Sequence, residues 1–214
     1  RLLGYARDIL IAFFLGASIY ADAFFVAFRL PNTFRRLFAE GTFNAAFIPS
    51  YTKEKIKNKK NGKNFADEVL TLLTLILLFI VLIAEIFTPY LVYLIAPGFS
   101  DNLEKFNLAT LLTKITFPFL LFVSLSSFFS AVLNSNNKFA AAAAAPIILN
   151  IVLIFSLCFS YFLNLNFVKN LSYGVTLAGI IQLIFLIFVT KKFYKPSIKL
   201  SIKISKKVKF FLRK

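Results

Sequence analysis

Long apolar stretches recur along this chain, and several reach the roughly 20 residues that an α-helix needs to cross a bilayer. They lie at about residues 64–96, 108–133, 139–164 and 172–190. Hydrophobic residues make up 59% of the sequence and include 29 phenylalanines, which exceeds the composition of soluble domains. Because backbone polar groups must be satisfied internally in lipid, such stretches fold as helices. The sequence therefore predicts an all-α polytopic membrane protein.

Basic residues are concentrated in two segments that flank the apolar stretches. Residues 52–64 hold six lysines against one acid, and residues 191–214 hold ten basic residues and no acid. Both segments are predicted to be cytoplasmic, because loops rich in lysine and arginine stay on that side. The net charge of +16 then reflects membrane topology. No nucleic-acid partner is expected, since the lysines are not interleaved with a stacking platform.

These features divide the chain into six predicted helices and a tail. Residues 1–17 are interpreted as the second part of a membrane helix that starts upstream, and Gly16 ends it. Six helices with both basic segments inside place the N-terminus in the cytoplasm as well. We expect residues 1–194 to form a six-helix transmembrane lobe and residues 195–214 a basic cytoplasmic linker with an amphipathic segment.

Local signals predict several helix boundaries. Asn64 is expected to cap the third helix, with Asp67 and Glu68 in its first turn, and Pro89 to kink this helix. Short connections are predicted at residues 97–107, 134–138 and 165–171, and an extended stretch at residues 197–205.

The stretch from residue 20 to residue 51 is apolar yet carries five charged side chains: Asp22, Arg29, Arg35, Arg36 and Glu40. At about 100° per residue, all of them except Arg35 fall on one helical face. An arginine or aspartate near the bilayer centre costs roughly 2.5–3.5 kcal/mol on insertion scales, so these groups are expected to face protein or a water-filled cavity.

Proline bends this same stretch. Pro31 removes the backbone hydrogen bond to the carbonyl of Ala27 and predicts a kink. We interpret a bent, mostly positive helix inside a membrane as part of a pathway for an anionic molecule. The alternative is that the arginines snorkel to the interface or pair with acids for structural reasons alone.

The composition excludes several classes of function. Cys158 is the single cysteine and there is no histidine, so neither a disulfide within the chain nor a transition-metal site is expected. The absence of histidine also removes the usual general base. No phosphate-cradling glycine-rich loop is present, which disfavours an ATP-driven pump. We expect a non-enzymatic protein without a cofactor.

Several segments carry a family resemblance. RLPNTFRRLFAEG (residues 29–41) is followed by APGF (96–99), LLTKITFPFLL (111–121), AVLNSNNKF (131–139) and APIILN (145–150). In this order and with this spacing they resemble the MurJ (MviN) family of lipid II flippases. The resemblance covers essentially the whole chain.

The resemblance implies a member of the multidrug/oligosaccharidyl-lipid/polysaccharide exporter superfamily, whose members have two six-helix lobes around a central cavity. This chain resembles the first lobe, so its implied partners are a C-terminal lobe, the membrane lipids and lipid II. The implied activity moves this undecaprenyl-pyrophosphoryl muropeptide from the inner to the outer leaflet of the bacterial plasma membrane for peptidoglycan synthesis.

The resemblance also implies site residues. Substrate-binding positions carry over onto Arg1, Arg7, Asp8, Asp22 and Arg35. Gate or cavity positions carry over onto Arg29, Arg36 and Glu40. The expected mechanism is alternating access, with the arginines holding the pyrophosphate by charge-assisted hydrogen bonds.

Three other functions compete with this interpretation. One is another exporter of the superfamily, acting on polysaccharide lipids or drugs. A second is a non-transporting scaffold for cell-envelope enzymes. The third, a membrane-embedded enzyme acting on polyprenyl phosphates, lacks a histidine or an acid cluster to perform the chemistry.

Overall fold

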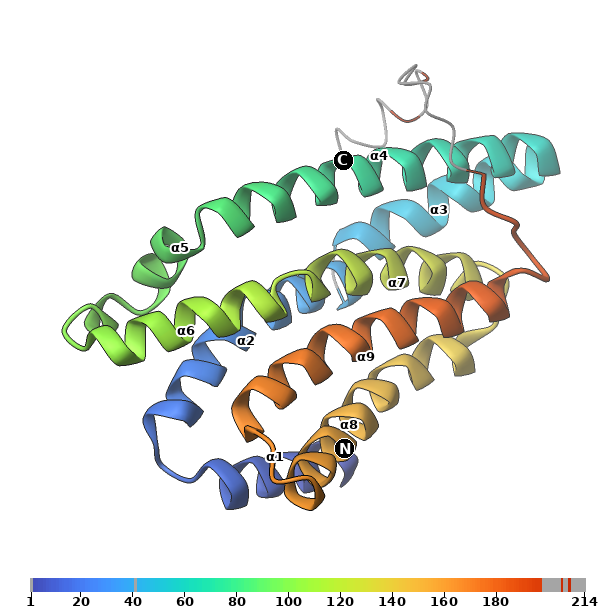
Figure 1. Cartoon of the computed structure of the whole chain (residues 1–214). Coiled ribbons are helices and arrows are strands. Elements are labelled where there is room, and N and C mark those ends of the chain that lie inside the picture. The colour runs from blue at the N-terminus through green and yellow to red at the C-terminus, as the bar shows by residue number, and fades with distance from the viewer. Residues whose placement is uncertain (1, 41, 198–204, 206–207, 209–214) are drawn as a thin grey trace.

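A computed structural model of the protein describes residues 2–40, 42–197, 205 and 208, the side chains of residues 34–40 and 42 excepted. Helices make up almost all of it (Figure 1). They are α1 (Leu2–Leu15), α2 (Ile19–Glu40), α3 (Thr42–Lys57), α4 (Lys59–Ile86), α5 (Thr88–Ile95), the 3-10 turn η1 (Pro97–Phe99), α6 (Leu103–Thr116), α7 (Phe119–Asn134), α8 (Phe139–Phe162) and α9 (Phe167–Thr190).

Within the described part of the chain, consecutive helices follow one another end to end and form six segments that match the predicted ones. α2 continues into α3, α4 into α5, and α6 into α7, while α1, α8 and α9 stand alone (Figure 1). Among the described residues, four stretches are long and apolar enough to cross a membrane: Lys59–Ile86, Leu103–Asn134, Phe139–Phe162 and Phe167–Thr190. The expectation of an all-α polytopic membrane protein is confirmed.

Proline marks the α4–α5 and α6–α7 joints. Pro89 follows the break at Phe87 between α4 and α5, as predicted, and Pro118 lies in the break between α6 and α7. At Pro31, by contrast, the helical residues of α2 continue from Ile19 to Glu40.

The predicted loop at residues 52–64 is wrong. α3 extends to Lys57 and α4 begins at Lys59, so only Asn58 interrupts the helix. Asn58, not Asn64, caps α4, since its side chain accepts a hydrogen bond from the Lys60 N–H at 2.9 Å. Lysine is a good helix former, and a lysine-rich segment therefore does not distinguish a loop from an exposed helix.

Two other helices also begin earlier than predicted, because an asparagine side chain caps each of them. α6 begins at Leu103 behind an Asn102 cap, and α9 begins at Phe167 behind an Asn166 cap, so the connections before these two helices are shorter than predicted. The tight turn at residues 134–138 is confirmed, with Asn137 in the left-handed region at φ 59°. The extended stretch predicted at residues 197–205 and the amphipathic end at 206–214 lie largely outside the described residues.

Small residues let the last helices pack closely. A Cβ added at Gly179 of α9 would lie 2.7 Å from a ring carbon of Phe119 in α7, and one added at Gly174 would lie 2.3 Å from Ser156 Oγ in α8. Close backbone approach of this kind replaces the hydrophobic driving force that is absent in lipid. α9 thereby packs along both α7 and α8.

The bundle has two ends that differ in charge. At one end lie the α3–α4 junction, the α7–α8 turn and the end of α9, with most of the lysines (Figure 1). Lys55 Nζ donates to Asn136 Oδ1 and ties the α3–α4 junction to the α7–α8 turn. At the other end lie the α1–α2 connection, the start of α6 and the α8–α9 turn.

Candidate functional site

Arg7 is held by two side chains between α1 and α8. Its Nε and Nη2 donate to Asp8 Oδ1 at 3.0 and 2.7 Å, and its Nη1 donates to Asn150 Oδ1 at 3.0 Å. The Arg7 side chain is 20% exposed, whereas that of Asp8 is 61% exposed. The structure therefore brings the predicted residues Arg7 and Asp8 together and adds Asn150.

A hydrogen bond within α8 orients the Asn150 side chain. Its Nδ2 donates to the carbonyl of Pro146 at 3.1 Å, which turns Oδ1 towards Arg7. The sequence analysis assigns Asn150 no role, although this residue ends the APIILN segment, where an amide interrupts an apolar helix. That interruption is the signal that could have identified it.

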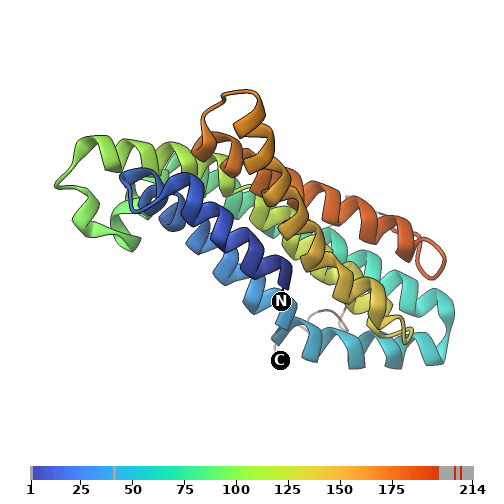
Figure 2. The same cartoon turned by 90° about the horizontal axis from the view of Figure 1, so that it is seen from below.

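This cluster lies at mid-depth in the bundle. Asn150 is midway along α8, about 16 Å from Phe139 at about 1.5 Å per residue. α1 runs along the second half of α8 (Figure 2), and Phe14 near the end of α1 stacks on Phe167, the first residue of α9. If α8 spans the bilayer, Arg7 and Asp8 sit near its centre, where unpartnered charges are expensive.

Asp22 has a different partner. Lys105 Nζ in the first turn of α6 contacts Asp22 Oδ2 at 2.5 Å and lies 4.3 Å from the centre of the Phe99 ring. The pair joins the start of α2 to the start of α6, at the end of the bundle that carries few lysines. Asp22 is thus at an end of the bundle and Arg7 at mid-depth. Lys105 was missed because a lone lysine in a short connection gives no sequence signal of a pair.

Arg29 lies on an exposed face of α2. Asp22, Phe25 and Arg29 are exposed on one stripe of this helix, whereas Phe24 and Ala27 are fully buried on the opposite one. Arg29 is about 15 Å along α2 from Ile19, which places it at mid-depth. No carboxylate of the described residues pairs with its guanidinium.

For four predicted site residues the structure gives no side-chain position. Arg1 is not described, and the side chains of Arg35, Arg36 and Glu40 are not described either, although their backbone continues α2.

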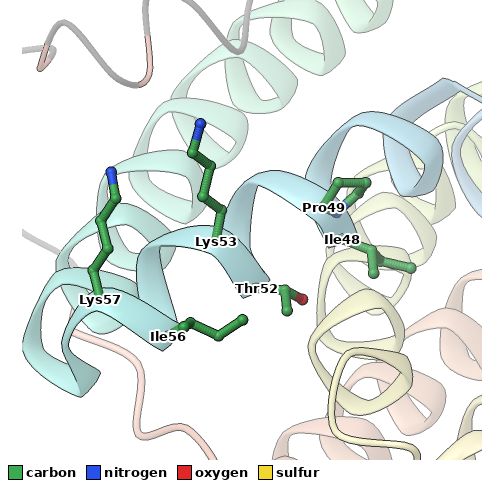
Figure 3. A pocket seen from close by; sticks show the side chains of 6 residues that line it. All are labelled: Ile48, Pro49, Thr52, Lys53, Ile56 and Lys57. Atoms are coloured by element: carbon green, nitrogen blue, oxygen red, sulfur yellow. The ribbon is translucent and has the colours of Figure 1, made fainter.

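A basic surface covers the outside of α3. Figure 3 shows Lys53 and Lys57 projecting to one side of this helix, away from Thr52 and Ile56. Together with Ile48 and Pro49 these residues line a shallow depression of about 570 Å³. Lys57 also pairs with Glu54 at 3.2 Å. Mixed apolar and lysine surfaces of this kind suit the interface of a membrane.

The segment after α9 is anchored on α4 by a buried carboxylate. Tyr194 Oη donates to Asp67 Oδ1 at 2.6 Å, and the Ser197 N–H donates to the same oxygen at 3.0 Å. Asp67 and Tyr194 are both buried. Burial, with the hydrogen bond to Asp67, raises the pKa of the Tyr194 phenol above its ordinary value. The sequence predicts Asp67 in the first turn of a helix. In the structure its carboxylate lies inside α4 and holds the segment that follows α9.

Comparison with known proteins identifies the family. A family model described as "Lipid II flippase MurJ" matches residues 11–214. A probable lipid II flippase MurJ of Rhizobium tropici is 46% identical over 188 residues, which cover 86% of this chain and 35% of that protein. The corresponding protein of Rickettsia prowazekii is 42% identical over 90% of this chain and 38% of its own length. The lipid II flippase MurJ of Burkholderia cenocepacia is 35% identical over 85% of this chain and 36% of its own length.

A solved structure agrees with the sequence comparisons. The lipid II flippase MurJ in an inward closed conformation superposes with a TM-score of 0.82 at 28% identity, over 99% of this chain and 43% of that one. The chain thus spans little more than a third of the length of the curated relatives it matches. Sequence and fold agree along nearly its whole length, and the chain belongs to the MurJ family of lipid II flippases.

Proposed function

We propose that this chain forms the first lobe of a flippase that moves lipid II from the inner to the outer leaflet of the bacterial plasma membrane. The relatives that match it are named lipid II flippases. The observation that carries the proposal is the charged cluster of Arg7, Asp8 and Asn150 at mid-depth, on a bundle with membrane-spanning helices. An anionic headgroup crossing the bilayer needs cationic donors at this depth.

Arg7 retains capacity for a ligand. Three of its five N–H donors are used by Asp8 and Asn150, which leaves two. A guanidinium with two free N–H groups can bind a phosphate oxygen by charge-assisted hydrogen bonds. Asp8 and Asn150 act as positioning residues, since they fix the guanidinium plane before the substrate arrives.

Arg29 supplies the second part of the proposal. Its exposed face needs protein or water against it, because a lipid-facing arginine at mid-depth is costly. We assign a C-terminal lobe to this face, with a water-filled chamber between the lobes. Arg1, Arg35, Arg36 and Glu40 belong to the same chamber or its gate, and Asp22 closes its far end with Lys105.

The mechanism we derive is alternating access without covalent change of the substrate. The pyrophosphate neutralises arginines that otherwise repel one another, and this favours closure of the lobes about it. The prenyl tail stays in lipid. We assign residues 1–194 to the lobe and residues 195–214 to the linker to the next one, with the basic segments in the cytoplasm and the start of α1 pointing towards that side.

Complementation tests the proposal. The full-length gene product carrying Arg7→Ala or Arg35→Ala is expressed in cells depleted of their own flippase, and lipid II exposed on the outer leaflet is measured. Both variants are expected to lose export at normal membrane abundance, and Lys169→Ala, in the first turn of α9, is the control. Normal export by both arginine variants would show that the proposed site is wrong.

Two rival functions are separated by further measurements. A different exporter of the superfamily would bind other polyprenyl-linked sugars as tightly as lipid II in a direct binding assay. A scaffold would tolerate neutral replacements at Arg7 and Arg35 but fail when the basic segments are deleted.

A further inference from the structure

A groove of about 640 Å³ separates the start of α8 from the end of α9, away from the Arg7 cluster. Phe139 and two alanines line it from α8, and Phe188 and Phe193 line it from the other side. Lys138 and Lys192 also line it, together with Asn137 and Val189. The groove therefore combines an apolar floor with two ammonium groups.

The lysines lie at the boundary of the membrane. Phe139 is the first residue of one candidate span and Thr190 the last residue of the next. Lys138 immediately precedes the first span, and Lys192 lies two residues beyond the second. Lysine stems of this length place the ammonium at headgroup level while the neighbouring rings remain at the level of the acyl chains.

No carboxylate that the structure describes neutralises the positive charge in this groove. Lys138 and Lys192 are both exposed, and no carboxylate of the described residues pairs with either. Lys191 adds a third cation beside them, 5.9 Å from the centre of the Phe188 ring. The start of α8 also lacks a side-chain cap, so its N–H groups contribute further positive potential.

The floor of the groove is exposed apolar surface. Phe139 is 60% exposed and Phe188 is 72% exposed. In a bilayer such rings are covered by acyl chains. A ligand that matches both parts carries a negative headgroup and a hydrocarbon chain.

We propose that this groove binds an anionic phospholipid, with its phosphate between Lys138 and Lys192 and an acyl chain along Phe139 and Phe188. Basic pockets between helices at one membrane face bind anionic lipid headgroups by the same combination of charge and apolar contact. The site is separate from the lipid II site proposed above and does not depend on transport.

Native mass spectrometry of the full-length gene product tests the site. The protein is released from detergent micelles that contain phosphatidylglycerol or phosphatidylcholine, and the lipid-bound fraction is measured for each. We expect wild-type protein to retain phosphatidylglycerol in preference. Lys138→Gln and Lys192→Gln should each weaken this binding about fivefold, and the double variant about 25-fold. Equal retention of the two lipids by wild type, or undiminished binding by the double variant, would overturn the proposal.

Two further variants separate this groove from general positive charge. Lys169→Gln removes one charge at the opposite end of α9 and should leave the preference unchanged. Ala140→Trp fills the groove but keeps both lysines, and should reduce phosphatidylglycerol binding. If Lys169→Gln weakens phosphatidylglycerol binding as much as Lys192→Gln does, the preference reflects the net charge of the protein and not this groove, which would overturn the proposal.

Excess inorganic phosphate distinguishes a lipid site from a bare phosphate site. Inorganic phosphate lacks the acyl chain and should not displace phosphatidylglycerol. Displacement at modest phosphate concentration would overturn the assignment to a lipid. Thermal unfolding of each variant in detergent checks that it is folded, and these exposed positions are expected to leave unfolding unchanged.

Discussion

The hydroxyl of Thr116 in α6 donates a hydrogen bond to the carbonyl of Ala27 in α2 at 2.9 Å. Ala27 is the residue whose helical partner four positions on is Pro31, which has no N–H. Both Thr116 and Ala27 are fully buried. A second helix therefore supplies the donor that proline withholds, and α2 can carry a proline between Asp22 and Glu40 without an orphaned carbonyl.

Replacing Thr116 by valine should expose this dependence. Thr116→Val keeps the shape but leaves the Ala27 carbonyl buried without its side-chain donor. We expect a loss of about 1–3 kcal/mol in the free energy of unfolding. Denaturant unfolding in detergent measures it, with Thr116→Ser as the control that keeps the hydroxyl. Equal stability of the valine and serine variants would contradict the role of this hydrogen bond.

The anchor between Asp67 and Tyr194 should depend on pH. Folding raises the pKa of Tyr194, so the neutral phenol is favoured in the folded state. The hydrogen-bonded phenol of Tyr194 therefore stabilises the folded state fully below about pH 10, the pKa of tyrosine in the unfolded chain. This stabilisation is lost as the pH rises towards the higher pKa of Tyr194 in the folded state. Cleavage of residues 191–197 by subtilisin, which stays active in alkaline solution, should therefore accelerate above about pH 10 in wild type.

Tyr194→Phe is the matched variant for that experiment. It removes the hydrogen bond to a carboxylate, so cleavage should be faster at pH 8 and should not show the additional acceleration above pH 10. The expected loss in stability is about 1.5–3 kcal/mol. A phenylalanine variant with the wild-type pH profile would show that another group is responsible.

Asn150 should be required for binding by Arg7. Asn150→Leu removes the acceptor of one guanidinium N–H without changing any charge. Hydrogen bonds to charged groups contribute about 1.5–3 kcal/mol, so we expect lipid II binding to weaken about tenfold or more. Asn107→Leu, at an exposed position of α6, is the control. Unchanged affinity of the Asn150 variant at normal expression would remove this residue from the site.

Gly179 should not tolerate a side chain. An added Cβ would lie 2.7 Å from Phe119, whose ring is fully buried, and 3.1 Å from Phe122. Gly179→Ala is expected to lower stability by about 1–3 kcal/mol through overpacking. The comparison is Gly98→Ala, where nothing lies within 4 Å of the added carbon. Thermal unfolding in detergent should separate the two, and similar melting temperatures would show that α9 moves aside.

Local signals in the sequence determined the helical class and several boundaries. Pro89 broke its helix, and the turn at residues 134–138 formed where polar residues separate two apolar stretches. The loop predicted from local signals at residues 52–64 is wrong, because lysines suit an exposed helix as well as a loop. Hydropathy and proline act over a few residues, and they predict only features of that range.

The partners of the charged residues were decided by the tertiary structure. Arg7 meets Asn150, which is 143 residues away in sequence, and Asp22 meets Lys105, which is 83 residues away. Asp67 meets Tyr194 at a separation of 127 residues. The sequence predicted which helices carry charged residues among apolar ones. Only the packing of those helices determined which charges are paired and which face remains open, because register and contact between distant helices depend on side chains that no local pattern contains.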